Sequence, residues 1–89
     1  MSAKVGISNY RKDKLTLAEL KRGQVAIIKD VSSPNIPLKL LEMGCLPGNK
    51  AHLVQIAPLS DPLYLNINDT HLAIRKETAI HIKIELAGE

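Results

Sequence analysis

Three histidines and one cysteine are the side chains of this 89-residue chain that could take part in metal chemistry: His52, His71, His81 and Cys45. Imidazole nitrogen and thiolate sulfur are common protein ligands of divalent transition-metal ions. The four residues show no His-x-His or Cys-x-x-Cys spacing, so only the fold could bring them to one point. Each histidine alternates with apolar neighbours, which predicts that all three lie on strands and point outward. We therefore expect surface histidines, and a metal site built from these four residues is the alternative.

Cys45 directly follows a glycine that we expect to end a helix. A thiol becomes reactive, or binds a metal, when nearby positive charge lowers its pKa. The C-terminal end of a helix carries a partial negative charge instead. We therefore expect Cys45 to be a small buried side chain. As the single cysteine of the chain it allows no internal disulfide bond, which fits a reducing compartment.

No arrangement of catalytic residues stands out in the sequence. The carboxylates show no pairing suited to general acid–base chemistry, and no glycine-rich loop is followed by Gly-Lys-Ser or Gly-Lys-Thr. No order of Ser, His and Asp suggests a nucleophilic triad. We expect a binding or regulatory protein and not an enzyme.

The elements that carry these side chains are mainly strands. Alternation of polar and apolar residues predicts five short strands, at residues 24–31, 51–56, 63–67, 72–74 and 80–86. A short amphipathic helix is expected at residues 36–43, capped by Asn35, between the first and second strands. A tight helical turn is expected at residues 75–79, before the last strand, and another after Thr16. This order predicts a mainly β fold, a small and partly open barrel.

The predicted helix is apolar over a wide part of its surface. Such a wide stripe implies that two sides of the helix are covered, one by the barrel and the other by a partner. We expect the partner on the side of Leu40. Gly44 is expected to take the left-handed conformation that ends the helix, and Pro47 follows as a stop signal.

A second candidate contact is the loop at residues 57–62, which contains two prolines. The prolines restrict the loop and so lower the entropy cost of binding, and Leu59 could form an exposed apolar tip. Further along the chain, Asn68 and Asp69 are expected to form a tight turn, because both residue types tolerate positive φ.

The charge of the chain is unevenly distributed. The formal net charge is +3, yet residues 1–22 alone contain six basic and two acidic side chains. We expect residues 1–14 to form a mobile basic arm, residues 15–86 the folded domain and residues 87–89 a short tail. Basic residues attract phosphate or an anionic membrane surface, and a solvated arm is the simpler interpretation. The absence of Phe and Trp argues against nucleic-acid binding by base stacking.

Four motifs occur in a fixed order: Thr-Leu-Ala-Glu-Leu-Lys-Arg-Gly-Gln, Leu-Leu-Glu-Met-Gly-Cys-Leu-Pro-Gly, Ala-Pro-Leu-Ser-Asp-Pro and Leu-Ala-Ile-Arg-Lys-Glu-Thr-Ala. Together they resemble the FeoA proteins of bacterial ferrous iron uptake, over about residues 15–86. The resemblance implies a small SH3-like barrel with an inserted helix. Met43 and Cys45 depart from it, because the family often has leucine at the first position and an aliphatic residue at the second.

The resemblance further implies a cytoplasmic accessory protein that contacts FeoB, the GTP-binding membrane transporter of ferrous iron. A cytoplasmic location also fits the absence of an apolar run long enough to span a membrane and of a signal peptide. The partner-binding residues carried over with the motifs are Leu40, Leu41, Met43, Gly44, Pro47, Gly48, Pro58, Leu59, Asp61 and Pro62.

Two alternative functions stay open at this point. The first is direct binding of Fe²⁺ or another divalent ion, as a carrier or sensor, through Cys45 and the three histidines. The second is a nucleic-acid-binding barrel, although we expect no nucleic acid among the partners. No other cofactor is expected. Association with a membrane is expected only through the transporter, and self-association is compatible with the sequence.

Overall fold

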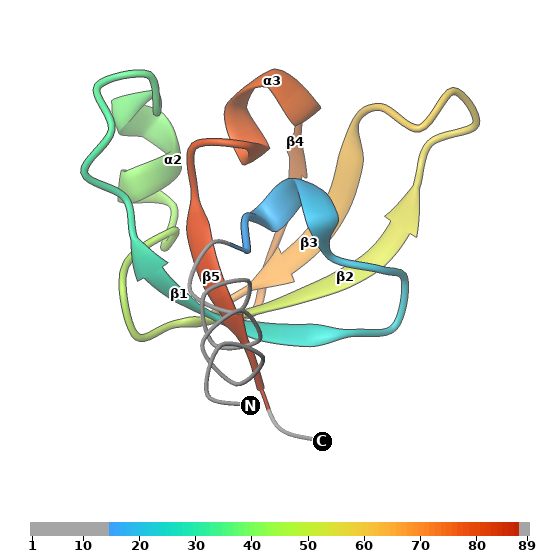
Figure 1. The fold of residues 1–89 in the computed structure, drawn as a ribbon, viewed down its shortest axis with the longest axis horizontal. Coiled ribbons are helices and arrows are strands. Elements are labelled where there is room, and N and C mark those ends of the chain that lie inside the picture. Colours follow the sequence, from blue (N-terminus) through green and yellow to red (C-terminus); the bar gives the residue numbers. More distant parts are fainter. Residues whose placement is uncertain (1–14, 88–89) are drawn as a thin grey trace, which may run out of the picture.

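The structure, a computed structural model, describes residues 15–87. The basic arm expected at residues 1–14 and the end of the expected tail lie outside the described residues. The elements in chain order are η1 (Leu17–Glu19), β1 (Val25–Asp30), α2 (Leu38–Glu42), β2 (Lys50–Ile56), β3 (Leu63–Ile67), β4 (Thr70–Ile74), α3 (Lys76–Ala79) and β5 (Lys83–Leu86). A mainly β fold, with a short helix after the first strand and a helical turn before the last, is therefore confirmed (Figure 1).

The five strands form one antiparallel sheet with the order β4-β3-β2-β1-β5. The sheet curls around the interior as an open barrel, and η1 and α3 lie at its open side (Figure 1). The pairing register shifts between Ile28 and Asp30 in β1 and again between Leu53 and Gln55 in β2. Bulges of this kind bend a strand and increase its twist, which lets so small a sheet curl.

The interior is built from aliphatic side chains at alternate strand positions. In β3, Leu63, Leu65 and Ile67 are buried while Tyr64 between them is exposed. The buried hydrophobic residues of the described chain are Leu17, Leu20, Ala26, Ile28, Ile36, Cys45, Ala51, Leu53, Leu63, Leu65, Ile67, Leu72, Ile74, Ala79, Ile82 and Ile84. Each large member contributes roughly 1.5–3 kcal/mol by leaving water, so aliphatic side chains supply the burial that an aromatic core would otherwise provide.

The β3–β4 connection is the tight turn that the sequence predicts. Asn68 and Asp69 both have positive φ, of 53° and 63°. Two left-handed residues in succession match the right-handed twist of the flanking strands. Ile67 and Thr70 consequently face each other as the first pair of the hairpin.

The predicted helix begins later than expected. It starts at Leu38, and Asn35 does not cap it, because Pro37 occupies the N-cap position and no side chain makes a cap hydrogen bond. Pro37 disfavours a helical conformation at the residue before it, so Ile36 stays outside the helix and is buried in the loop. Thr16 likewise makes no side-chain cap for η1. Its backbone forms a bridge with β5.

The last strand is also shorter than predicted. It begins at Lys83, whereas Ile80 and His81 belong to the turn that follows α3. The Ile80 N–H donates to Lys76 O at 3.1 Å, and the His81 N–H donates to Thr78 O at 3.0 Å. These bonds continue the helical turn, so alternation of apolar residues at this point was not sufficient evidence for a strand.

Candidate functional site

The end of α2 is closed by a complete Schellman motif. Gly44 has a φ of 110°, its N–H donates to Leu41 O at 3.1 Å, and the Cys45 N–H donates to Leu40 O at 3.0 Å. Glycine adopts this conformation without the steric penalty of a side chain. The glycine stop expected from the sequence is therefore confirmed.

Two hydrogen bonds and a close approach of backbone fix the end of α2 and the following turn against the sheet. The Asn49 side-chain amide donates to Gly44 O at 2.7 Å. A Cβ atom placed on Gly44 would lie 3.3 Å from Cβ of Asn68, in the β3–β4 turn. The Gly48 N–H donates to Ile28 O at 2.8 Å. Gly44 and Gly48 thus shape the turn that positions the end of α2, and their part in partner binding stays a prediction.

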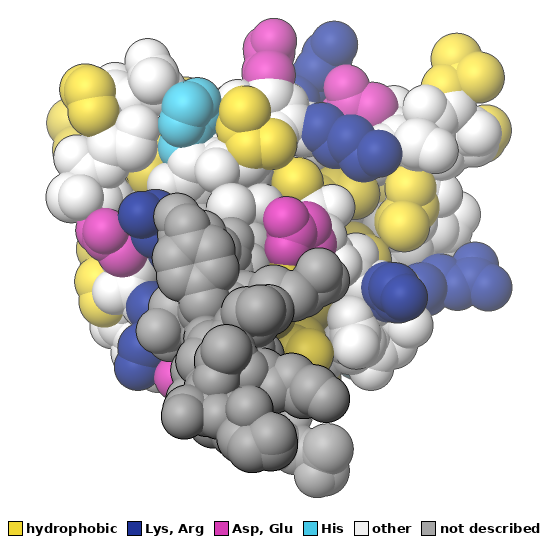
Figure 2. Space-filling view, viewed as in Figure 1, with side chains coloured by type: hydrophobic (Ala, Val, Ile, Leu, Met, Phe, Trp, Pro, Cys, Tyr) yellow, Lys and Arg dark blue, Asp and Glu magenta, His cyan; other side chains and the backbone are white. Residues whose placement is uncertain are grey.

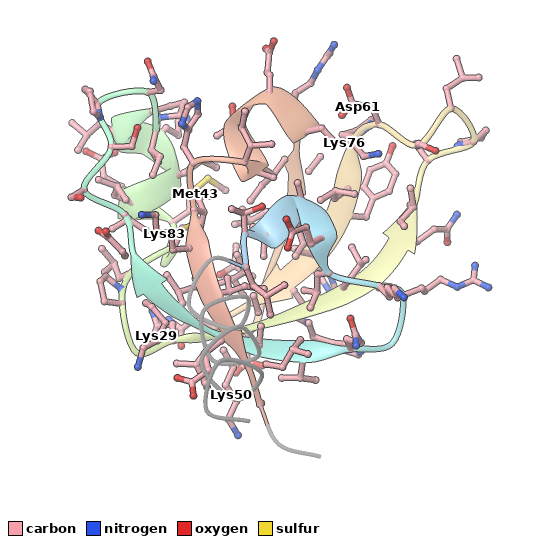
Figure 3. All side chains as sticks on the ribbon, in the orientation of Figure 1. Lys29, Met43, Lys50, Asp61, Lys76 and Lys83 are labelled. Atoms are coloured by element: carbon pink, nitrogen blue, oxygen red, sulfur yellow. The ribbon has the colours of Figure 1, made fainter. Side chains whose placement is uncertain are left out.

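The exposed apolar surface of α2 differs from the one expected. Leu40, Leu41 and Met43 are half-buried and pack against the core. Figure 3 shows Met43 on the side of α2 that faces the barrel. Leu38 is 66% exposed, and Leu46 in the following turn is 43% exposed. Leu38 and Leu46 are therefore the most exposed large apolar side chains of this segment, and contact of the half-buried Leu40 side with a partner stays a prediction.

The β2–β3 loop presents the most exposed large apolar side chain of the described residues. Leu59 is 89% exposed at the tip of this loop. The Ala57 N–H donates to Pro62 O at 3.1 Å, and the Ser60 N–H donates to Ala57 O at 2.7 Å. Backbone bonds therefore close the loop at its base and inside its tip. The exposed apolar tip expected from the sequence is confirmed.

Asp61 connects this loop to α3. Its Oδ1 atom accepts a hydrogen bond of 2.9 Å from the Lys76 N–H, and its Oδ2 atom lies 3.7 Å from Nε of Arg75. Figure 3 shows Asp61 and Lys76 side by side near the loop and α3. A carboxylate at a helix N-terminus accepts the free N–H groups of the first turn. Asp61 therefore caps α3 from a distant part of the sequence.

This structural role of Asp61 was not predicted, although the sequence contains a weak signal for it. The N-cap position of α3 is occupied by Arg75, whose side chain makes no cap hydrogen bond. Ser, Thr, Asp and Asn are the usual residues at that position. A helix without a local cap needs a hydrogen-bond acceptor from elsewhere in the chain. The carboxylate of an aspartate in a rigid loop can be that acceptor.

Three elements with exposed apolar residues project from one side of the barrel. Figure 1 shows α2, α3 and the β2–β3 loop along the same edge of the molecule. They carry Leu38, Ile80 and Leu59, and Ile80 is 52% exposed. Hydrophobic side chains appear at separate places along this edge in Figure 2, with polar and charged groups between them. We call Leu38, Ile80 and Leu59 the apolar edge.

The four candidate metal ligands are not brought together. Cys45 is fully buried, and burial raises the pKa of its thiol to about 11, so the thiol stays protonated. His81 lies in the turn after α3, where the sequence predicted a strand. His52 and His71 lie on the outward face of the sheet in one row, each opposite Asn66. Residues 15–87 contain no group of three or more His, Cys, Asp or Glu side chains that could hold a metal ion.

The curled five-stranded sheet with its short helices defines a small β-barrel domain. No helix in the described part of the chain is both long and apolar enough to cross a membrane. The FeoA domain family model matches residues 15–86, and the chain belongs to the FeoA family.

Relatives with known names support this membership. The chain is 40% identical over 73 residues to an Fe(2+) transport protein A/Fe(2+) transporter FeoB fusion protein of Porphyromonas gingivalis. That alignment covers 81% of this chain and 9% of the relative, so the chain spans a small part of the curated protein that it matches.

Solved structures share the fold. The FeoA protein of Chlorobium tepidum superposes with a TM-score of 0.76 at 29% identity, covering 83% of this chain and 71% of that one. The Stenotrophomonas maltophilia FeoA, described as a prokaryotic SH3 domain protein complexed with zinc, gives a TM-score of 0.68 at 25% identity and covers 80% and 89%. The expected SH3-like fold is therefore confirmed.

Proposed function

We propose that this protein is a cytoplasmic accessory of ferrous iron uptake that acts by contact with the cytoplasmic part of a FeoB-type transporter, without catalysis of its own. The observation that carries this proposal is the relative in which a matching segment is fused to an Fe(2+) transporter FeoB. Fusion of two domains in one chain keeps them at high effective concentration. A domain that acts on its partner by contact needs a docking surface on its folded structure.

The apolar edge is the docking surface that we propose. Leu59 and Leu38 expose 89% and 66% of their surface to solvent. Large apolar side chains at the centre of an interface supply much of the binding energy, while the polar residues around them exclude water. The edge comes from three separate elements, so a partner would contact a shape that only the folded barrel presents.

The structure also supports this choice through the order of the loop. Hydrogen bonds from Ala57 and Ser60 shape the tip, and Asp61 fixes its far end to α3. A loop that is ordered before binding loses less conformational entropy when the partner arrives. The remaining loop-motif residues, Pro58 and Pro62, would then act by restricting the backbone.

The test is co-purification of the full chain with the cytoplasmic part of the transporter encoded beside it or in the same genome. We expect Leu59→Asp and Leu38→Asp each to weaken binding at least about tenfold, because a charge would have to leave water at the interface. Val54→Asp is the matched control, since Val54 is 44% exposed and belongs to β2, a strand that carries none of the three apolar-edge residues. It should bind as the wild type does.

Circular dichroism must show that all three variants are folded. Normal binding by both folded leucine variants would contradict the apolar edge as the docking surface. Loss of binding by Val54→Asp alone would place the contact on the outward face of the sheet instead. Leu40→Asp is a poor test, because Leu40 packs against the core and a charge there would weaken the fold itself.

A further inference from the structure

The two edge strands of the sheet, β5 and β4, differ in how they are protected. The edge of β5 is covered along part of its length by the segment before η1. The Ile84 N–H donates to Leu15 O at 3.0 Å, and the Leu17 N–H donates to Ile82 O at 2.9 Å. β5 also carries the charged residues Lys83 and Glu85, which oppose pairing with another chain.

The edge of β4 has none of these protections. Thr70–Ile74 contains no charged residue and no proline, and its register with β3 runs without a bulge. Native proteins usually use charged residues, proline or bulges to keep an exposed edge strand from pairing with another chain. An uninterrupted edge strand is a ready template for another strand.

The direction of the free backbone groups follows from the hairpin. In a two-residue turn the flanking residues form a hydrogen-bonded pair, here Ile67 and Thr70. Hydrogen-bonded and non-hydrogen-bonded pairs then alternate along the ladder. The N–H and C=O groups of His71 and Ala73 therefore point away from β3. Within residues 15–87 these groups have no backbone partner on that outer side.

We propose that β4 is a self-association edge, on which a second copy of this chain adds its own β4 in antiparallel orientation. A two-fold axis at Leu72 places His71 of each copy opposite Ala73 of the other. The free groups of these residues then form four backbone hydrogen bonds, and the two sheets join into one continuous sheet. Such an interface is isologous and closes on itself, as in most homodimers.

Charge at the ends of the strand selects this register. Arg75, directly after β4, is still extended, with φ −70° and ψ 148°. With the axis at Leu72, Arg75 of each copy comes opposite the turn residue Asp69 of the other, which brings opposite charges near each other twice. Arg75 also lies 3.7 Å from Asp61 of its own chain, at an exposed position that leaves its guanidinium accessible to a second carboxylate. A shift of the axis by one residue in either direction, to His71 or Ala73, separates these charges. Opposite charges in facing positions stabilise a strand pair, and like charges destabilise it.

The dimer should be weak. The strands are five residues long, and interfaces well below about 1,000 Å² belong to transient complexes. Sedimentation velocity of the full chain should therefore show a dimer that grows between about 10 µM and 1 mM protein. A chain that stays monomeric throughout this range would overturn the proposal. The transporter takes no part in this experiment, so the result does not depend on the proposed function.

A pair of variants locates the interface. Ala73→Lys puts a long charged side chain on the edge and should raise the dimer dissociation constant at least about tenfold. The exposed residue Val54 lies on the same sheet but away from the edge, so Val54→Lys is the matched control and should dimerise as the wild type does. Equal dimerisation of both variants and the wild type would contradict pairing through β4.

Nuclear magnetic resonance tests the register. A sample that mixes labelled and unlabelled chains should show an intermolecular contact between the Hα atoms of the two Leu72 residues, which face each other in a non-hydrogen-bonded pair. Amide exchange of His71 and Ala73 should slow as concentration rises. Asp69→Asn tolerates the same positive φ and should weaken the dimer several-fold at low salt, with Glu19→Gln as an exposed control. Intermolecular contacts at α2 or β5 without any at Leu72 would overturn the proposal.

Discussion

Among individual residues, Cys45 shows how burial controls chemistry in this domain. Its side chain has no exposed surface, and removal from water raises the pKa of the thiol to about 11. A protonated thiol is a weak nucleophile and a weak metal ligand. A buried cysteine at this position was predicted from the sequence, and the structure confirms the burial.

We predict that Cys45 makes the protein less stable at high pH. In the unfolded chain the thiol ionises near its ordinary pKa of 9.0, whereas in the folded protein it stays protonated until about pH 11. The unfolded state loses its proton first, so the free energy of unfolding falls as pH rises through this window. The full effect amounts to about 2–3 kcal/mol.

Urea unfolding of the wild type and of Cys45→Ala across this pH range provides the measurement. Lysine and tyrosine also titrate there, but they do so in both proteins. The advantage of the wild type over the variant should therefore shrink as pH rises. An advantage that stays constant would mean that the folded protein does not shield the thiol.

A second prediction at the residue scale compares two glycines with positive φ. An alanine at either Gly44 or Gly48 should cost about 1–2 kcal/mol through its backbone conformation. Gly44→Ala should cost more, because its new Cβ would lie 3.3 Å from Asn68, whereas nothing lies within 4 Å at Gly48. Denaturant unfolding measures both variants, and equal losses would show that the Asn68 turn moves aside freely.

Between elements, the most consequential bond joins the β2–β3 loop to α3 through Asp61. Helix α3 has only four residues and no side-chain cap of its own. Such a short helix depends on its tertiary contacts. The loop and α3 therefore hold each other in place, although fourteen residues separate Asp61 from the start of α3 at Lys76.

We predict that Asp61→Ala lowers the free energy of unfolding by about 1 kcal/mol, as loss of a helix cap does elsewhere. Asp61→Asn keeps an oxygen acceptor for the Lys76 N–H and should lose less than half as much. Chemical denaturation gives the two values, and hydrogen exchange of the Lys76 amide should quicken in the alanine variant. Equal losses for alanine and asparagine would assign the effect to the ion pair with Arg75 and not to the cap.

At the scale of the whole molecule, the order of elements was predictable because local signals agree with the final fold. Strand alternation, the Gly44 stop and the Asn68–Asp69 turn each depend on residues close in sequence. The extent of β5 was overestimated, because Ile80 continues a strand-like alternation while backbone bonds keep it in the turn after α3.

The candidate site was predictable only in part. The exposed tip at Leu59 followed from its position between prolines. The face of α2 did not, because Leu38 and Leu40 are both apolar and only the packed structure shows that Leu38 is exposed while Leu40 packs against the core. Tertiary contacts of this kind, including the Asp61 cap, leave little trace in a single sequence.

The hydrogen bonds that order the β2–β3 loop have a consequence for the rate of association with a partner. A loop closed by Ala57 and Ser60 and tied to α3 by Asp61 is already in one shape before any encounter. Collisions with a partner then need no slow rearrangement of the tip, and the association rate depends on diffusion and orientation. Variants that alter Leu59 should consequently change the lifetime of a complex far more than the rate at which it forms.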